Sequence, residues 1–254
     1  MAGGIFVKIK KLISAMLFGS MILCMSGCNI SDFSADNLLR PPKAVGDEAE
    51  IEQLIAQTAD SGYTLKYPKN GKFRSAIIIT DLDGNGSDEA VAFFRNSAET
   101  SSVHMLVMYS KDNSWKIASD NIFETTDIDS VDFADVTGNG KSEIIVNSTT
   151  YTPNVGKLFC YSYSDGKTSD IGSGQSCSSF VTGDFDGDGT SEIMSLVLYT
   201  TENEALASML DYNDDNKSLY AKAMANMDPN VAKYKNIAVT KLEGDVAGVV
   251  VDGT

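Results

Sequence analysis

Three short acidic segments of this 254-residue chain contain the residue types that bind a hard divalent cation. Each begins with Asp, ends eight positions later with Glu, and has oxygen-bearing side chains at alternate positions. Calcium takes about six to eight oxygen ligands, which a tight loop supplies from alternate side chains and a backbone carbonyl. The predicted calcium ligands, with one backbone carbonyl in each segment, are Asp81, Asp83, Asn85, Ser87 and Glu89; Asp135, Thr137, Asn139, Lys141 and Glu143; and Asp184, Asp186, Asp188, Thr190 and Glu192.

The three segments differ in charge. The third has four carboxylates, which repel one another unless a cation lies among them. The first has Asn85 at one of these positions, and the second has Thr137 where another carboxylate would stand. The alternative is a set of metal-free turns in which Asp and Asn side chains bind their own backbone. Three copies in register favour calcium in the first and third segments, and the second stays open between the two readings.

An EF-hand does not fit these segments. That motif needs a carboxylate at its twelfth position and helices on both sides. The twelfth positions here are Ala92, Val146 and Ser195, and the flanking runs are typical of strands.

The elements that must hold these loops are short apolar runs bounded by turn residues. Around the first loop we expect strands at 73–80, 89–94, 103–109 and 115–118. The three loops start 54 and 49 residues apart, and repetition at a period of roughly 50 residues is typical of β-propellers. We therefore expect an all-β fold of β-propeller-like repeats, with four-stranded blades and calcium loops, over residues 67–254.

A degenerate fourth copy is expected at 237–251, with Thr240 and Leu242 in place of loop carboxylates. The sequence stops at Thr254 within this copy, which makes about three and a half blades. Propellers usually close with roughly four or more blades, because an open array leaves unpaired strand edges. We expect a truncated version of a longer protein, with self-association as the alternative.

The N-terminal segment has the pattern of an export signal. Lys8, Lys10 and Lys11 precede the apolar run 12–25, which is short of the ~20 residues of a membrane span. Met25-Ser26-Gly27-Cys28 resembles the lipobox of bacterial lipoproteins. The resemblance implies a lipoprotein signal peptide at 1–27 and a fatty-acyl anchor on Cys28 that holds an extracytoplasmic protein on the cell membrane. A plain signal peptide or an uncleaved anchor is the alternative.

Two segments connect this anchor to the repeats. Residues 28–46 are polar and suit a linker. Residues 47–66 are expected to hold a helix and its lead-in, since apolar side chains from Ile51 to Ile55 have helical spacing and acidic residues occupy the first turn. This amphipathic helix, at about 47–59, should pack on the domain that follows.

The loop pattern Asp-x-Asp-Gly-x-Gly resembles the FG-GAP or VCBS repeats of integrin-α-like β-propellers. The resemblance covers about residues 73–252 and implies a calcium-stabilised propeller. That family serves adhesion, surface binding and enzyme accessory roles, so the fold does not select a function. The order of lipobox, linker, helix and repeats is also similar to uncharacterised lipoproteins of Gram-positive bacteria.

Composition narrows the classes of partner and of chemistry. The chain has 20 basic and 35 acidic residues and a net charge of −15, which disfavours nucleic acid. The one histidine, His104, fits an ordinary strand position, and no Ser or Cys with a base partner is evident. We expect a non-enzymatic surface module that binds a glycan or a protein. The alternatives are a surface polysaccharide hydrolase or lyase, or its accessory subunit, using an acidic pair, and an envelope structural protein.

Two sets of side chains have more than one reading. Four tyrosines serve either as ligand platforms or, as alternate spacing favours, as core residues: Tyr151, Tyr161, Tyr163 and Tyr199. An exported protein permits a disulfide between Cys160 and Cys177, but spacing alone does not bring them together, and we expect two separate buried thiols.

Overall fold

The computed structural model describes residues 46–59, 62–99, 101–150, 155–199, 204–228, 234–241 and 247–253. All of them belong to one compact unit, Ala44–Thr254. The predicted signal peptide, the lipidation site Cys28 and nearly all of the linker lie outside these residues, as do Tyr151 and Leu242. None of the helices in these ranges has the length and apolarity required to cross a membrane.

The described helix, α3 (Asp47–Ala59), agrees with the predicted amphipathic helix. Its first turn holds three acidic residues, where carboxylates interact favourably with the helix dipole. Ile51 and Ile55 are fully buried, because residues four apart lie on the same helix face.

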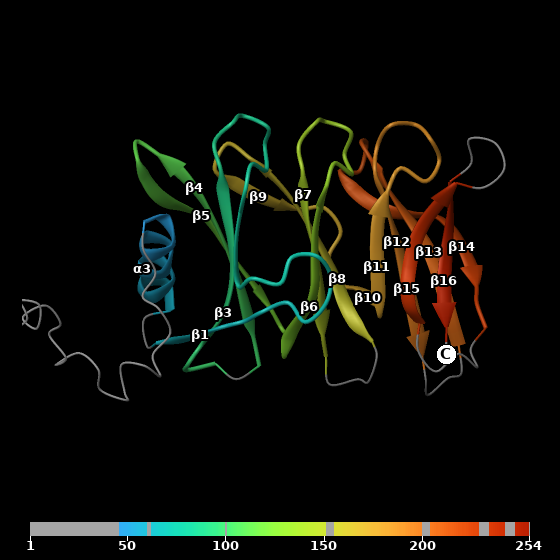
Figure 1. The fold of residues 1–254 in the computed structure, drawn as a ribbon, viewed down its shortest axis with the longest axis horizontal. Coiled ribbons are helices and arrows are strands. Elements are labelled where there is room, and N and C mark those ends of the chain that lie inside the picture. The colour runs from blue at the N-terminus through green and yellow to red at the C-terminus, as the bar shows by residue number, and fades with distance from the viewer. Residues whose placement is uncertain are drawn as a thin grey trace, which may run out of the picture. The chain divides into compact units, whose positions relative to one another are not determined.

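The strands form three antiparallel sheets and one separate pair (Figure 1). Sheet 1 contains β1 (Tyr63–Leu65), β2 (Ile77–Thr80), β3 (Glu89–Asn96), β4 (Val103–Lys111) and β5 (Ser114–Phe123). Sheet 2 contains β6 (Asp127–Ala134), β7 (Glu143–Thr149), β8 (Gly156–Ser164), β9 (Lys167–Asp170) and β10 (Gln175–Cys177). Sheet 3 contains β11 (Ser179–Gly183), β12 (Glu192–Tyr199), β13 (Glu204–Asn213) and β14 (Ser218–Asn226). The pair is β15 (Tyr234–Lys241) and β16 (Ala247–Gly253).

Each five-stranded sheet is four strand positions wide, because one position is divided between two short strands. In sheet 1, β2 pairs with β3 from Glu89 to Ala92, and β1 pairs with the same edge of β3 from Phe94 onward. In sheet 2, β9 and β10 pair with opposite ends of β8. The sheets therefore repeat the predicted four-strand plan, with an interruption in one position.

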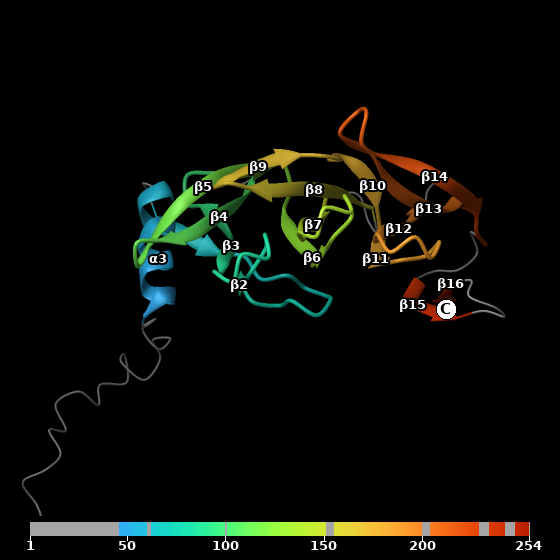
Figure 2. The same cartoon turned by 90° about the horizontal axis from the view of Figure 1, so that it is seen from above.

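Alternating side chains of β3 serve two different cores. Val91 and Phe93 lie in the core between sheets 1 and 2, whereas Ala92 and Phe94 face the core beneath α3. Successive strand residues point to opposite faces of a sheet, which is why one strand supplies both. A third core joins sheet 2 to sheet 3. Figure 2 shows α3 against sheet 1, on the side away from sheet 2.

The predicted β-propeller is confirmed only in part. The described residues form a mostly β unit of three four- or five-stranded sheets and one strand pair, and they form no closed propeller. The face of sheet 1 that a closing blade would cover is occupied by α3, which buries Ile51 and Ile55 there. The predicted fourth copy corresponds to the β15–β16 pair, which has two strands in the described residues.

Candidate metal centre

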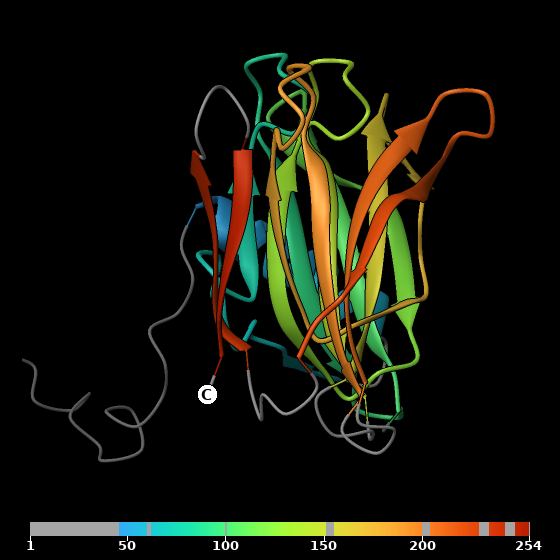
Figure 3. The same ribbon diagram turned by 90° about the vertical axis from the view of Figure 1, so that its right-hand side faces the viewer.

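The three acidic segments connect equivalent strands, namely β2 to β3, β6 to β7 and β11 to β12. Figures 1 and 3 show the three loops at the same end of their sheets. Adjacent loops are also hydrogen-bonded, since the Ser142 amide donates to the Leu82 carbonyl at 2.8 Å and the Ser191 amide to the Asp135 carbonyl at 2.9 Å. The sequence repeat therefore becomes a row of neighbouring loops.

The Glu that ends each loop is the first residue of the next strand and is buried: Glu89 is 2% exposed, Glu143 1% and Glu192 0%. In each case Oε2 accepts a hydrogen bond from the second amide of the loop. The donors are Leu82 at 2.8 Å, Val136 at 2.9 Å and Phe185 at 2.8 Å. This carboxylate therefore joins the two ends of the loop.

The Asp that begins each loop binds backbone amides, as the metal-free turn reading predicts. Asp184 accepts from Gly187 at 2.7 Å and from Gly189 at 3.0 Å, and Asp81 accepts from Gly84 and Gly86 at 2.8 and 2.9 Å. The glycines have positive φ, which lets the backbone turn around the carboxylate. Each carboxylate oxygen has two lone-pair sites, so these bonds leave acceptor capacity for a cation.

The remaining predicted ligands are brought together in the same way in all three loops. The amide of the seventh residue donates to the side-chain oxygen of the fifth. The pairs are Ser87 with Asn85 at 2.7 Å, Lys141 with Asn139 at 2.8 Å and Thr190 with Asp188 at 2.8 Å.

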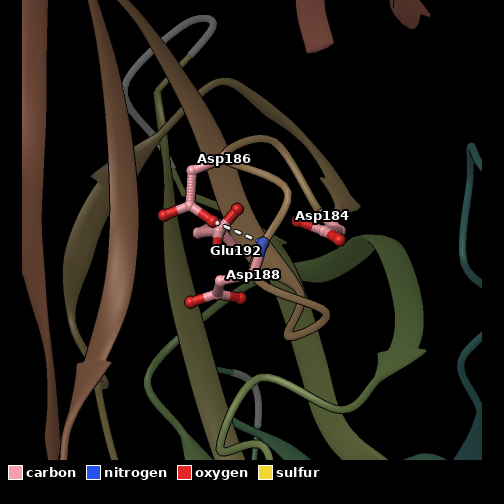
Figure 4. Close-up of side chains that lie close together, drawn as sticks. All are labelled: Asp184, Asp186, Asp188 and Glu192. Atoms are coloured by element: carbon pink, nitrogen blue, oxygen red, sulfur yellow. Dashed lines mark hydrogen bonds between the residues drawn. The ribbon is translucent and has the colours of Figure 1, made fainter. Parts of the chain in front are cut away.

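The third loop gathers four carboxylates. Asp184, Asp186, Asp188 and Glu192 each place one oxygen within 4.8 Å of the others (Figure 4). Glu192 Oε1 is buried, and no described residue gives it a hydrogen bond. Burial raises the pKa of Glu192, the Phe185 amide opposes this rise, and the charges of Asp186 and Asp188 add to it. The group thus combines four carboxylates with a buried oxygen that has no hydrogen-bond partner among the described residues.

The first loop gathers three carboxylates, from Asp81, Asp83 and Glu89, whose oxygens also lie within 4.8 Å of one another. Burial raises the pKa of Glu89, the Leu82 amide lowers it in part, and the charges of Asp83 and Asp81 raise it further. This loop has the same acidic character with one carboxylate fewer.

The second loop differs because Thr137 satisfies its buried glutamate. Glu143 Oε1 accepts from the Thr137 hydroxyl at 3.1 Å, while Oε2 accepts from the amides of Val136 and Thr137 at 2.9 and 3.2 Å. Burial nevertheless raises the pKa of Glu143. Within the described ranges, carboxylate groups of the kind that hold a metal form in the first and third loops. The bond from the Thr137 hydroxyl favours a metal-free turn in the second loop, and the choice between the two readings stays a prediction.

Lys222 and Asp211 lie beside the third loop and were not predicted from the sequence. The Lys222 ammonium pairs with Asp186 Oδ2 in the loop and with Asp211 Oδ2 at 2.8 Å. Both come from the β13–β14 hairpin, and Lys222 is 36 positions from Asp186. The alternation of side chains around these residues indicates strands, which is a local signal. Only the pairing of β13 with β14 brings the two residues to the loop.

His104 has more polar contacts than an ordinary strand residue. It is 5% exposed on β4 and stacks on Phe94, with ring centroids 4.8 Å apart. Its Nδ1 lies 2.9 Å from Asp120 Oδ1, and its Nε2 lies 3.2 Å from Glu99 Oε2, which also accepts from Ser102. The serine hydroxyl contacts Glu99 and not the imidazole, so this network does not have the arrangement of a nucleophile and its base.

The other open readings concern tyrosines and cysteines. Tyr163 is buried in the core between sheets 1 and 2, and Tyr161 is partly buried against it, as core residues. The side chain of Tyr199 lies outside the described part. Cys160 and Cys177 are both buried and free, as predicted, and burial raises the pKa of the Cys177 thiol to about 12.

A scan against protein-family models gave no match for this chain, and a search of curated proteins also gave none. The resemblance to FG-GAP repeats therefore rests on the loop residues alone.

Proposed function

We propose that this protein is a calcium-binding array of β-sheet repeats that acts outside the cytoplasm as a non-enzymatic binding module, anchored to the membrane through a lipid on Cys28. The part of the proposal that the geometry supports best is cation binding by the first and third loops. The anchor is supported by the lipobox-like residues before Cys28.

The observation that carries the proposal is Glu192 Oε1. A buried acceptor without a partner costs about 1–3 kcal/mol, and more when it is charged. Here Glu192 belongs to a group with three aspartates, and the charges of two of them, Asp186 and Asp188, raise its pKa further. A divalent cation would satisfy the oxygen and neutralise the group in one step, whereas a metal-free turn explains neither feature.

Calcium suits this donor set better than other common cations. All of the candidate ligands are oxygens, and no His or Cys belongs to either group. Oxygen-only sets select hard cations, and calcium tolerates irregular loops better than magnesium, which demands near-ideal octahedral geometry.

The role of calcium would be to stabilise the ends of neighbouring sheets. The second loop is hydrogen-bonded to the first through Ser142 and to the third through Ser191. A cation that binds the folded loops and not the unfolded chain shifts the folding equilibrium towards the native state. Calcium at the first and third loops would therefore hold three sheets in a row and keep their loop end ordered for a glycan or protein ligand.

Calcium binding is tested by titration calorimetry of the full-length chain in non-ionic detergent. Two binding events are expected from the described loops, and Asp81→Asn with Asp83→Asn, or Asp184→Asn with Asp186→Asn, should each remove one of them.

The matched control is Asp135→Asn in the second loop, which should leave both binding events in place. Wild-type protein that gives no calcium heat at millimolar concentration would contradict the proposal.

A further inference from the structure

Lys222 occupies an irregular position in sheet 3. In the pairing of β13 with β14, Leu210 is opposite Ala221 and Met209 is opposite Ala223, so Lys222 has no partner across the strands. It is the extra residue of a β-bulge. A bulge re-aims a side chain that regular pairing would direct elsewhere, and bulges are frequent beside functional sites.

The bulge brings the ammonium to two carboxylates from different elements. One is Asp186, a predicted ligand in the third loop, and the other is Asp211 on β13. Tyr220 also donates to Asp211 Oδ2, at 3.2 Å, which holds that carboxylate in place. The ammonium therefore lies between a fixed carboxylate outside the loop and a loop carboxylate that calcium would need.

Sheet 1 provides an internal comparison, because it has the same bulge without the charges. There Met108 is opposite Ile117 and Val107 is opposite Ser119, which makes Ala118 the extra residue. On the neighbouring strand Tyr109 is opposite Glu89, the buried glutamate of the first loop.

When the two sheets are aligned on their buried glutamates, Asp211 of sheet 3 occupies the position of Tyr109 in sheet 1. The bulge residues, Lys222 and Ala118, then also occupy equivalent positions. The ion pairs of Lys222 with Asp186 and Asp211 are thus specific to the third loop and are not a consequence of the bulge itself.

We propose that Lys222 is an internal counter-cation that competes with bound calcium for Asp186, so that the third loop binds calcium more weakly than its four carboxylates alone would. Without metal, the ammonium offsets part of the carboxylate repulsion in the loop. When calcium binds, the ammonium gives up Asp186 and keeps Asp211. This inference concerns the regulation of the third loop and rests on the calcium binding proposed above.

Competition between Lys222 and calcium would give the first and third loops different responses to calcium. The first loop has three carboxylates in its group, and no ammonium contact to Asp81, Asp83 or Glu89 is found among the described residues. In the third loop the extra carboxylate is opposed by Lys222. The calcium affinity of the third loop would therefore depend on Lys222, whereas that of the first loop would depend on its own ligands alone.

The test uses the full-length chain in non-ionic detergent, with Asp81→Asn and Asp83→Asn present so that only the third loop titrates. Lys222→Gln should tighten calcium binding about two- to fivefold, the range expected when a partly exposed ion pair is removed. The same substitution should lower the thermal stability of the calcium-free protein. Opposite signs in affinity and stability distinguish competition from a merely structural role, which would weaken both.

Lys217→Gln is the matched control. Lys217 belongs to the same hairpin and pairs with Asp214, so the substitution removes the same charge away from the loop. It should leave calcium affinity unchanged, and Lys222→Arg should restore wild-type affinity.

Unchanged or weaker calcium binding in Lys222→Gln, with wild-type binding intact, would overturn the role of Lys222 alone. A chain that gives no calcium heat with either Lys or Gln at position 222 would overturn the proposed function as well.

Discussion

Glu192→Gln tests whether the third loop stores an unpaired buried charge. Glu192 is fully buried, and its Oε1 accepts no hydrogen bond from the described residues. Gln keeps an oxygen for the Phe185 amide, removes the charge and supplies an amino group that can donate to the neighbouring aspartates. The substitution should therefore stabilise the calcium-free protein, which is unusual for a change in a fully buried residue.

The size of the effect follows from the unpaired oxygen. Relief of a buried unsatisfied acceptor is worth about 1–3 kcal/mol. For a unit of this size, 1 kcal/mol shifts the melting temperature by roughly 2–4 °C, so the calcium-free variant should melt roughly 2–12 °C higher than wild type. Calcium at 100 times its Kd would add about 2.7 kcal/mol to wild type, and this gain should be lost from the third loop of the variant.

Glu143→Gln is the matched control at the equivalent position of the second loop. Both oxygens of Glu143 already accept hydrogen bonds from Val136 and Thr137. In Glu143→Gln the amide oxygen can still accept from the Val136 and Thr137 amides, and the new amino group can donate to the Thr137 hydroxyl, so the stability of the calcium-free protein should change little. The same chemical change should thus stabilise the third loop and leave the second nearly unchanged.

Urea unfolding followed by circular dichroism, in chelator and again in millimolar calcium, measures both variants against wild type. If Glu192→Gln stabilises the calcium-free protein no more than Glu143→Gln does, then Glu192 Oε1 has a partner and the reasoning fails. If calcium still stabilises Glu192→Gln as strongly as wild type, the third loop is not a cation site.

Three further predictions follow from the same geometry. Thr137→Asp should convert the second loop into a calcium site, because it removes the hydroxyl that satisfies Glu143 and adds a carboxylate; calorimetry should show one more binding event, and an unchanged stoichiometry would contradict this. Ile55→Ala should cost about 2–5 kcal/mol in urea unfolding, since Ile55 is fully buried between α3 and sheet 1, and a loss below about 1 kcal/mol would mean that α3 does not seal that face. The raised pKa values of Glu89 and Glu192 mean that their protonated forms favour the folded metal-free state, so this contribution is complete below pH 4.5 and is lost as the pH rises through the raised values. Calcium needs the ionised forms, so the calcium-induced rise in melting temperature should be larger at pH 7.5 than at pH 5, and equal rises would contradict this assignment.

The acidic loops and the strands beside them could be predicted from the sequence because their interactions are local. The bonds from Asp184 to Gly187 and Gly189 span at most five positions, and those from Glu192 to the Phe185 amide span seven. Such contacts depend on residue type and spacing within one loop. The helix could be predicted for the same reason, since its pattern lies within 13 residues.

The arrangement of the sheets could not be predicted from the repeat. A period of about 50 residues indicates blades, but it does not say which face of the first blade is free. That face is covered by α3 through Ile51 and Ile55, which pack against Phe94 and its neighbours. The choice between a ring and an array depends on packing between elements that are distant in the chain.

The sequence by itself determined that three loops would carry oxygen-bearing side chains in register, and that the second would lack a carboxylate at position 137. Only the tertiary structure decided what each loop does with its buried glutamate. Glu143 accepts from the Thr137 hydroxyl, whereas Glu192 Oε1 is buried without a donor among the described residues and Lys222 contacts Asp186 from a bulge in β14. The physical reason is that burial and strand register are set by packing across the sheets, and these two quantities control whether a carboxylate is satisfied by the protein or needs a cation.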